Sequence, residues 1–171
     1  NDSEGKWVMD WASGNAGFAL TGAGSEDPAS FPTSSSEEGM VGKCVKLVTK
    51  GTGDFGEKLD MPIAAGNLFM GTFNMGNALT DPLKATKFGV PFEFVPTYLK
   101  GYYKYKAGEV YKDEKGNEVK NKKDTWDIYA IFYETDENTK TLDATDRFDH
   151  PNLISIARIE EKDRKETDEW T

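Results

Sequence analysis

Short apolar segments separated by turn residues run along most of the chain. Each spans only a few positions and is rich in aromatic and β-branched residues, as strands on pleated, half-buried surfaces are. The predicted strands are Trp7–Trp11, Lys43–Thr49, Asn67–Phe73, Val90–Phe94, Tyr98–Lys106, Asp127–Tyr133 and Leu153–Ile159. We find no amphipathic helix with start and stop signals, and only Asp81–Thr86 suits a short helix. This pattern is typical of a β-sandwich or barrel, so we expect an all-β fold.

The connections between these segments are polar. Thr21–Gly39 and Thr135–Pro151 are long loops, and connections of this length in a compact domain are usually functional or mobile. Lys112–Asp124 is a charged hairpin, and we expect its turn at Lys115-Gly116-Asn117.

Length and charge narrow the classes of function. The 171 residues suit one domain, residues 1–171, and the formal net charge is −9. An acidic surface repels phosphate backbones, so we expect no nucleic-acid partner. No stretch approaches the roughly 18 apolar residues of a membrane span.

Cysteine and histidine are scarce. Cys44 is the only cysteine, which excludes an intrachain disulfide, and its place in an apolar segment favours a buried small hydrophobe. His150 is the only histidine, which excludes most histidine-based metal sites and nucleophilic triads. The chain begins at Asn1 without Met and ends at Trp170-Thr171 as if entering a further strand, so we expect a domain truncated at its C-terminus.

One series of motifs in the middle of the chain is distinctive as a combination. It consists of Asn67-Leu68-Phe69-Met70-Gly71-Thr72-Phe73, Phe88-Gly89-Val90-Pro91-Phe92, Pro96, Gly101-Tyr102-Tyr103-Lys104-Tyr105 and Asp127-Ile128-Tyr129-Ala130-Ile131-Phe132-Tyr133. In this order and spacing the motifs resemble the putative carbohydrate metabolism domain family, over roughly residues 7–171. A departure is Val95, where the family often has Arg.

The resemblance implies a fold and a setting. The fold would be a jelly roll, a β-sandwich of two antiparallel sheets similar to carbohydrate-binding modules. The family occurs in exported proteins of glycan-harvesting Gram-negative gut bacteria, often lipoproteins, so periplasm or outer-membrane surface is the expected location. An immunoglobulin-like module typically precedes the domain.

Exposed aromatic rings are the groups that would recognise a saccharide, because the C–H face of a pyranose packs on a flat ring. The candidates are Trp7, Trp11, Tyr98, Tyr102 and Trp126. Neighbouring residues of a strand point to opposite faces, so Tyr103 and Tyr105 share one face while Tyr102, Lys104 and Lys106 share the other. Because the lysines require water, we expect Tyr102 on the wetter face and the other two tyrosines in the core.

Two carboxylates are candidates for glycoside hydrolysis, which normally needs one protonated and one ionised carboxyl group. Glu93 lies between two phenylalanines, and Asp127 lies at the mouth of an apolar segment. Alternation alone would turn Glu93 to water, and backbone N–H groups could satisfy Asp127.

Among metals, calcium is the one that the oxygen-rich side chains suit. Asp143, Asp146 and Asp149 are spaced by three and could converge, although a solvated acidic loop is the alternative. We expect no other cofactor, because Gly51-Thr52-Gly53 is not followed by a predicted helix that would make a phosphate-binding loop.

Three functions follow from these features. The first is binding of an oligo- or polysaccharide by a non-catalytic domain of an exported glycan-use protein. The second is glycoside hydrolysis by Glu93 and Asp127. The third is a protein-interaction or adhesion module whose exposed aromatics meet another chain.

Overall fold

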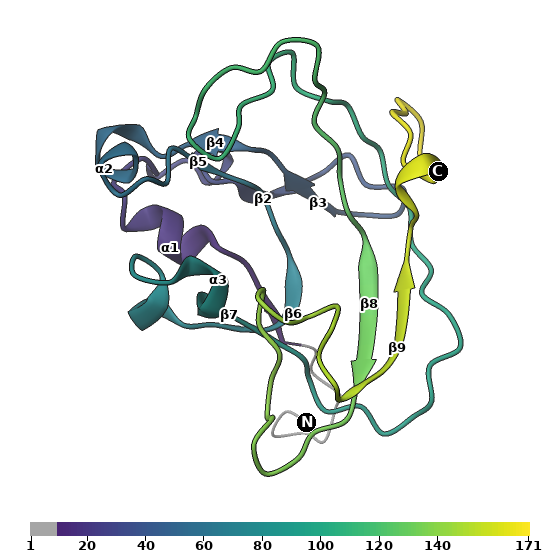
Figure 1. Cartoon of the computed structure of the whole chain (residues 1–171). Helices are drawn as coiled ribbons and strands as arrows, with labels where there is room; N and C mark the ends of the chain where they lie inside the picture. Colours follow the sequence, from purple (N-terminus) through teal and green to yellow (C-terminus); the bar gives the residue numbers. More distant parts are fainter. Residues whose placement is uncertain (1–9) are drawn as a thin grey trace.

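The structure is a computed structural model that describes residues 10–171, so the predicted site residue Trp7 lies outside the described residues. Short helices gather on one side of the molecule and a long two-stranded ladder forms the other side (Figure 1). The strands are β1 (Trp11–Ala12), β2 (Thr33–Ser36), β3 (Cys44–Leu47), β4 (Lys50–Gly51), β5 (Ile63–Ala64), β6 (Phe69–Phe73), β7 (Thr86–Phe88), β8 (Tyr129–Tyr133) and β9 (Leu153–Arg158). The helices are α1 (Asn15–Ala19), α2 (Gly53–Lys58) and α3 (Pro82–Ala85), with 3₁₀ turns at Pro28–Ser30, Met75–Asn77 and Glu161–Asp163.

The strands pair in several small antiparallel sheets. One has the order β1-β6-β7, and β2 with β3, β4 with β5 and β8 with β9 each form a two-stranded sheet. The longest ladder sets Tyr129 against Arg158 and Ile131 against Ile156, with a register shift between Phe132 and Tyr133. A chain made mostly of antiparallel strands agrees with the predicted all-β class, while the two-sheet sandwich stays a prediction.

Two of the predicted strands do not form. Val90–Phe94 is irregular, because Pro91 has no N–H to donate and the preceding Gly89 has a left-handed φ of 115°. In Tyr98–Lys106 only Tyr105 forms a bridge, to Thr167. The predicted hairpin turn is confirmed, since the Gly116 N–H donates to the Asp113 carbonyl at 2.9 Å and Gly116 has a φ of 80°.

The structure contains more helices than the sequence pattern predicts. The expected short helix is present as α3, but α1 and α2 were not predicted. Helix α2 begins at Gly53, the second glycine of Gly51-Thr52-Gly53, after which no helix was expected. The Thr52 hydroxyl donates to the Met61 carbonyl at 2.5 Å and ties the start of α2 to the residues beyond it. This tertiary hydrogen bond, and not a side-chain cap, accompanies the helix start.

The best-buried apolar side chains belong to the helical side of the molecule. We call Phe18, Ala78, Ala85 and Leu142 the α1 core; they are 4%, 6%, 0% and 1% exposed. Phe18 packs edge-on against Phe31 with ring centroids 5.8 Å apart. The Phe88 N–H donates to the Leu142 carbonyl at 2.7 Å, which draws the long loop before β9 onto β7.

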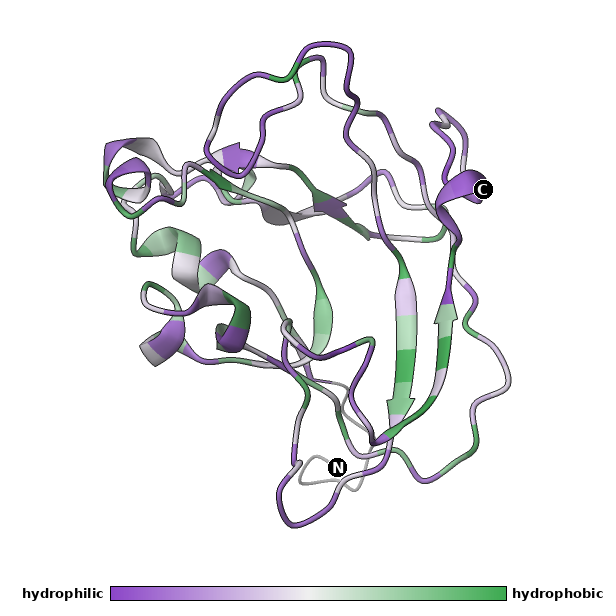
Figure 2. Ribbon diagram, in the orientation of Figure 1, coloured by the Kyte–Doolittle hydropathy of each residue, from purple (hydrophilic) through white to green (hydrophobic). Residues whose placement is uncertain are grey.

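The β8–β9 ladder is much less covered. Every residue of β9 after Leu153 is exposed, although this strand is largely apolar (Figure 2). The segment before the tyrosines is similar, since Phe92, Phe94 and Val95 are all exposed. Buried packing is therefore concentrated on one side of the chain.

Candidate functional site

A cavity of about 270 Å³ lies between the start of β3 and the C-terminal segment. We call it the Tyr102 groove, and its lining residues are Met40, Val41, Lys43, Cys44, Tyr102 and Trp170. Tyr102 is 63% exposed and Met40 and Val41 are also exposed, so the groove combines aromatic and aliphatic surface. Lys43 also lines it, and its ammonium group lies 2.7 Å from the Glu37 carboxylate.

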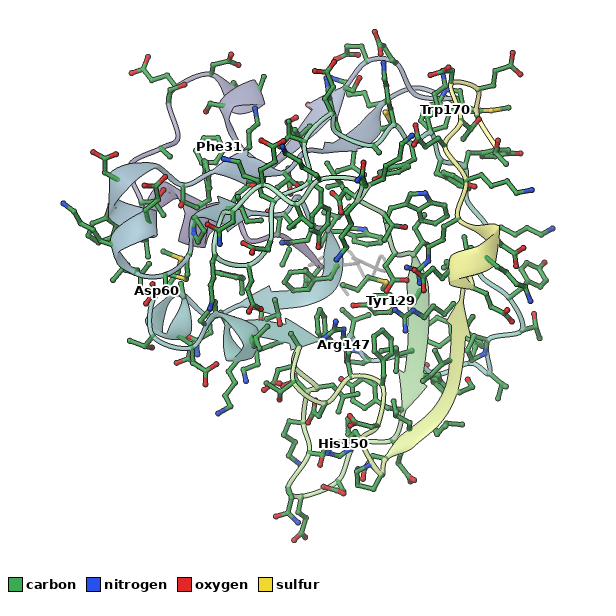
Figure 3. All side chains as sticks on the ribbon, turned by 45° about the horizontal axis from the view of Figure 1, so that its top comes forward. Phe31, Asp60, Tyr129, Arg147, His150 and Trp170 are labelled. Carbon is green, nitrogen blue, oxygen red and sulfur yellow. The ribbon has the colours of Figure 1, made fainter. Side chains whose placement is uncertain are left out.

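Backbone pairing holds the aromatic walls of the groove. The N–H of Tyr103 donates to the Thr171 carbonyl, and the N–H of Thr171 donates to the Tyr103 carbonyl, both at 3.0 Å. These bonds bring Trp170 beside the tyrosine-rich segment, on the C-terminal part of the chain (Figure 3). Lys104 Nζ lies 5.3 Å from the centre of the Trp170 ring, a cation–π contact that fixes this wall further.

The tyrosines alternate as the strand period predicts. Tyr103 and Tyr105 are half-buried, and their ring centroids lie 4.3 and 6.3 Å from that of Trp126. Tyr102, Lys104 and Lys106 are exposed. The packing on Trp126 is what turns Tyr102 toward the groove.

The environment of Trp126 is that of a packed side chain. Tyr103 covers its ring, and neither Trp126 Nε1 nor the Tyr105 hydroxyl has a hydrogen-bond partner within residues 10–171, although both atoms are buried. Burial raises the pKa of Tyr105, and the nearby carboxylates of Asp124 and Glu166 add to the effect.

The other aromatic candidates lie apart from the residues that line the groove. Tyr98 is exposed, with Lys100 Nζ 4.8 Å from its ring centre. Trp11 is exposed in β1, where it pairs with Met70 of β6. Neither residue contributes to the lining of the Tyr102 groove.

Asp127 is held by two arginines. Arg158 binds it through two hydrogen bonds, Nε to Oδ1 at 3.0 Å and Nη2 to Oδ2 at 2.6 Å. Arg164 Nη2 donates to the same Oδ1 at 2.8 Å and its Nε donates to the Ile159 carbonyl at 3.1 Å. The hydrogen bonds to Asp127 raise the pKa of Arg158. The partners of this carboxylate are thus guanidinium groups and not backbone N–H groups.

A second cavity, of about 300 Å³, adjoins this ion pair. Its lining residues are Arg158, Ile159, Glu160, Glu161 and Arg164, and we call it the Arg164 cavity. Glu93, the other candidate carboxylate, is exposed in an irregular segment, and because its neighbours Phe92 and Phe94 are exposed too, strand alternation is not the cause.

The aspartates considered for calcium serve the loop before β9. Asp143 Oδ1 accepts hydrogen bonds from the N–H and the hydroxyl of Thr145, and Asp146 Oδ1 accepts one from the Asp143 N–H. Burial acts to raise the pKa of Asp143, but the bonds from Thr145 and the charges of Lys87 and Lys84 hold it below its usual range.

Asp149 contributes its backbone N–H to the Asp146 carbonyl, and the His150 ring lies 3.9 Å from the Asp146 carboxylate at the loop seen in Figure 3. Within residues 10–171, no three His, Cys, Asp or Glu side chains form a group able to hold a metal ion. Calcium at this loop stays a prediction.

The two cavities offer complementary chemistry. The Tyr102 groove presents a ring face and aliphatic groups, which suit the C–H face of a sugar, and Lys43 can donate to a hydroxyl. The Arg164 cavity presents fixed guanidinium donors and carboxylate acceptors.

Trp170 is the aromatic residue of the groove that sequence reasoning missed. Its position near the end of the chain suggested only a strand entry, and its contact with Lys104 joins residues 66 positions apart. The signal available was its aromatic character alone, since the pairing of Tyr103 with Thr171 is a tertiary feature.

The chain matches one family model and resembles several solved structures, among them two from Bacteroides species. The model of the family described as putative carbohydrate metabolism domain matches residues 1–171. A structure from Bacteroides thetaiotaomicron, described as a putative glycoside hydrolase, is 56% identical with a TM-score of 0.93. One from Bacteroides vulgatus, described in the same words, is 46% identical with a TM-score of 0.89.

The lengths of these chains differ from that of the present one. The matches cover 100% of this chain, but only 49% of the Bacteroides thetaiotaomicron chain and 66% of the Bacteroides vulgatus chain. A search of curated proteins finds no match. In the described part of the chain, no helix has the length and apolar character that crossing a bilayer requires.

Proposed function

Because the chain belongs to the putative carbohydrate metabolism domain family, we propose that it binds an oligo- or polysaccharide in the Tyr102 groove. The observation that carries this proposal is the exposed ring of Tyr102 in a cavity that Trp170 also lines. Packing of Tyr103 and Tyr105 on Trp126 holds the segment, so the ring of Tyr102 is placed before any ligand arrives. Preorganised rings lose little side-chain entropy on binding.

The test is a panel of plant, host and microbial glycans, with binding followed by intrinsic Trp fluorescence and products followed by chromatography. Tyr102→Ala and Trp170→Ala should each weaken binding about tenfold or more, as expected for loss of a stacking ring or of the wall beside it. Tyr111→Ala is the matched control, because Tyr111 also carries a lysine over its ring, Lys122 at 4.3 Å, yet does not line the groove.

The outcomes separate this function from others. Saturable binding without product, weakened in both groove variants and kept in Tyr111→Ala, supports a binding domain. Binding that is unchanged in Tyr102→Ala and Trp170→Ala would refute the groove as the site, and absence of binding across the panel would refute saccharide binding itself.

Glycoside hydrolysis is the second candidate function, supported by the two similar structures that are described as putative glycoside hydrolases. In this chain Asp127, which accepts three hydrogen bonds from guanidinium groups, would be the base or nucleophile, and Glu93 the acid. Product formation lost in Glu93→Gln or Asp127→Asn, and kept in Asp168→Asn, would favour this function over binding alone.

We also propose that the domain works in the periplasm or at the outer-membrane surface, in a glycan-use protein, and that its small sheets belong to a two-sheet jelly roll. The family's usual setting supports the first point and the uniformly antiparallel pairing supports the second. Cell fractionation of the source organism tests the location, and an experimental structure tests the jelly roll.

A further inference from the structure

We propose that the Arg164 cavity is a second subsite, which binds the hydroxyl groups of a neutral pyranose unit of the same oligosaccharide that stacks in the Tyr102 groove. This inference rests on the proposed function and extends it to the polar residues Arg158, Glu161 and Arg164. It assigns them a role that neither the family description nor the similar structures state.

The guanidinium groups of Arg158 and Arg164 are hydrogen-bond donors held in fixed positions. Asp127 binds both guanidinium groups, and Arg164, whose side chain is only 9% exposed, is tied to the Ile159 carbonyl as well. Each arginine uses Nε and Nη2 in these bonds, and Nη1 of each makes no hydrogen bond within residues 10–171. A guanidinium has five N–H donors in a rigid fork, so the two arginines keep donor capacity in a fixed geometry.

The Glu161 carboxylate is a hydrogen-bond acceptor that remains available to a ligand. Glu160 is occupied by Lys162, with Nζ 2.6 Å from Oε2. The carboxylate of Glu161 is exposed and makes no hydrogen bond or ion pair with the residues that the structure describes. Because a sugar hydroxyl both donates and accepts, a pair of hydroxyls can bridge the Glu161 carboxylate and the guanidinium donors.

Charge points to a neutral ligand. The cavity lining holds two arginines and two glutamates, Arg158, Arg164, Glu160 and Glu161. Asp127 and Lys162 lie outside the lining but form ion pairs with it, so the charges balance. The whole chain carries a net charge of −9, which disfavours an acidic glycan further. Charge-assisted hydrogen bonds to neutral hydroxyls need no counter-charge from the ligand.

The two cavities lie on one short segment. Arg164 and Trp170 are six positions apart, and an extended chain of that length spans at most about 22 Å. The bonds of Tyr105 with Thr167 and of Tyr103 with Thr171 hold this segment along the tyrosines. One oligosaccharide can therefore reach both cavities, and joining two sites raises the affinity for a ligand that is long enough.

The experiment compares ligand lengths by isothermal titration calorimetry. Probes are maltose, cellobiose, xylobiose and mannobiose with the corresponding neutral hexasaccharides. Glu161→Gln and Arg158→Lys should each weaken binding of the tightest hexasaccharide about tenfold and leave the disaccharide unchanged. Asp163→Asn, in the same 3₁₀ turn but outside the cavity lining, is the control that should bind as the original chain does.

The experiment distinguishes failure of the second subsite from failure of the proposed function. If hexasaccharide binding depends on Trp170 but is unaffected by Glu161→Gln and Arg158→Lys, the second subsite is wrong and the groove stands. Tighter binding of galacturonate oligosaccharides than of neutral ones would overturn the neutral ligand class. If no neutral saccharide binds, both the subsite and the proposed function fail. Circular dichroism and thermal unfolding verify that each variant is folded.

Discussion

The α1 core and the β8–β9 ladder differ in how they hold the chain together. In the α1 core, Ala85 and Leu142 are essentially inaccessible to water, whereas in the ladder Ile154 is 58% exposed. The ladder is instead joined at one end by the ion pairs of Asp127. Side-chain packing should therefore determine stability on the helical side. Changes in the ladder should cost the protein only moderate stability, and the end of the ladder holds polar groups in fixed positions.

The largest expected effect is on the α1 core. Leu142→Ala should lower the free energy of unfolding by about 2–5 kcal/mol, because it removes buried methyl groups and leaves a cavity. Urea unfolding followed by Trp fluorescence measures the change. A loss as small as that of an exposed leucine would contradict the comparison.

Gly89 lies where the two regions meet, and Gly89→Ala should cost about 1–3 kcal/mol. Its φ of 115° suits glycine alone, and an added Cβ would collide with the Tyr133 hydroxyl, which donates to the Phe88 carbonyl at 2.6 Å. Thermal unfolding tests this. Measured against Tyr133→Phe alone, Gly89→Ala should cost less, because the hydroxyl is gone. An unchanged cost would assign the loss to backbone strain and to the Tyr133 ring carbons, which remain 2.9 and 3.1 Å from the added Cβ.

At the open end of the ladder, Asp127→Ala should cost about 1–2 kcal/mol, because it leaves Arg158 and the largely buried Arg164 without their carboxylate. Asp127→Asn keeps an acceptor and should cost less. Unfolding by urea at low and high salt provides the measurement, and equal stability of the original chain and Asp127→Ala would show that these ion pairs contribute nothing.

A smaller effect is expected on the stability of the folded chain at low pH. The side-chain hydrogen bond from Asn152, followed by the N–H groups of Thr139 and Asn138, lowers the pKa of Asp136 from its ordinary value of 3.8. A lowered folded-state pKa gives stability that is present above pH 3.8 and is lost as the pH falls through the folded-state value. Asp136→Asn should therefore be less stable than the original chain near neutral pH, and the gap should close in acid. A gap that is constant across this titration would be the contrary result.

The smallest effect is expected on the face of β9. Ile154→Ala should change the free energy of unfolding by less than about 0.5 kcal/mol, because this side chain is already exposed. It is the counterpart of Leu142→Ala under the same denaturant. A loss comparable to that at Leu142 would mean that Ile154 is covered in solution.

Local patterns predicted those parts of the fold that depend on neighbouring residues. The alternation from Tyr102 to Lys106 placed the exposed and half-buried side chains correctly, because a strand period of two acts within a few residues. The strand predicted at Val90–Phe94 is wrong, because the prediction gave the apolar composition of this segment more weight than Pro91.

The site depends on contacts that no local pattern contains. Asp127 meets Arg158 and Arg164, which follow it by 31 and 37 positions, and only the pairing of β8 with β9 brings the first of them close. The same holds for Trp170 beside Tyr102, which depends on the bonds between Tyr103 and Thr171. The sequence identified candidate residue types, but only the folded structure shows which of these residues lie close together.

The half-buried Cys44 in the wall of the Tyr102 groove gives this molecule a built-in chemical reporter. Since it is the only cysteine of the chain, an alkylating dye attaches at one place without any prior substitution. A saccharide seated on Tyr102 should shield this thiol and slow its labelling. The rate of a single covalent reaction then reads out occupancy of the groove, even for a glycan that carries no chromophore.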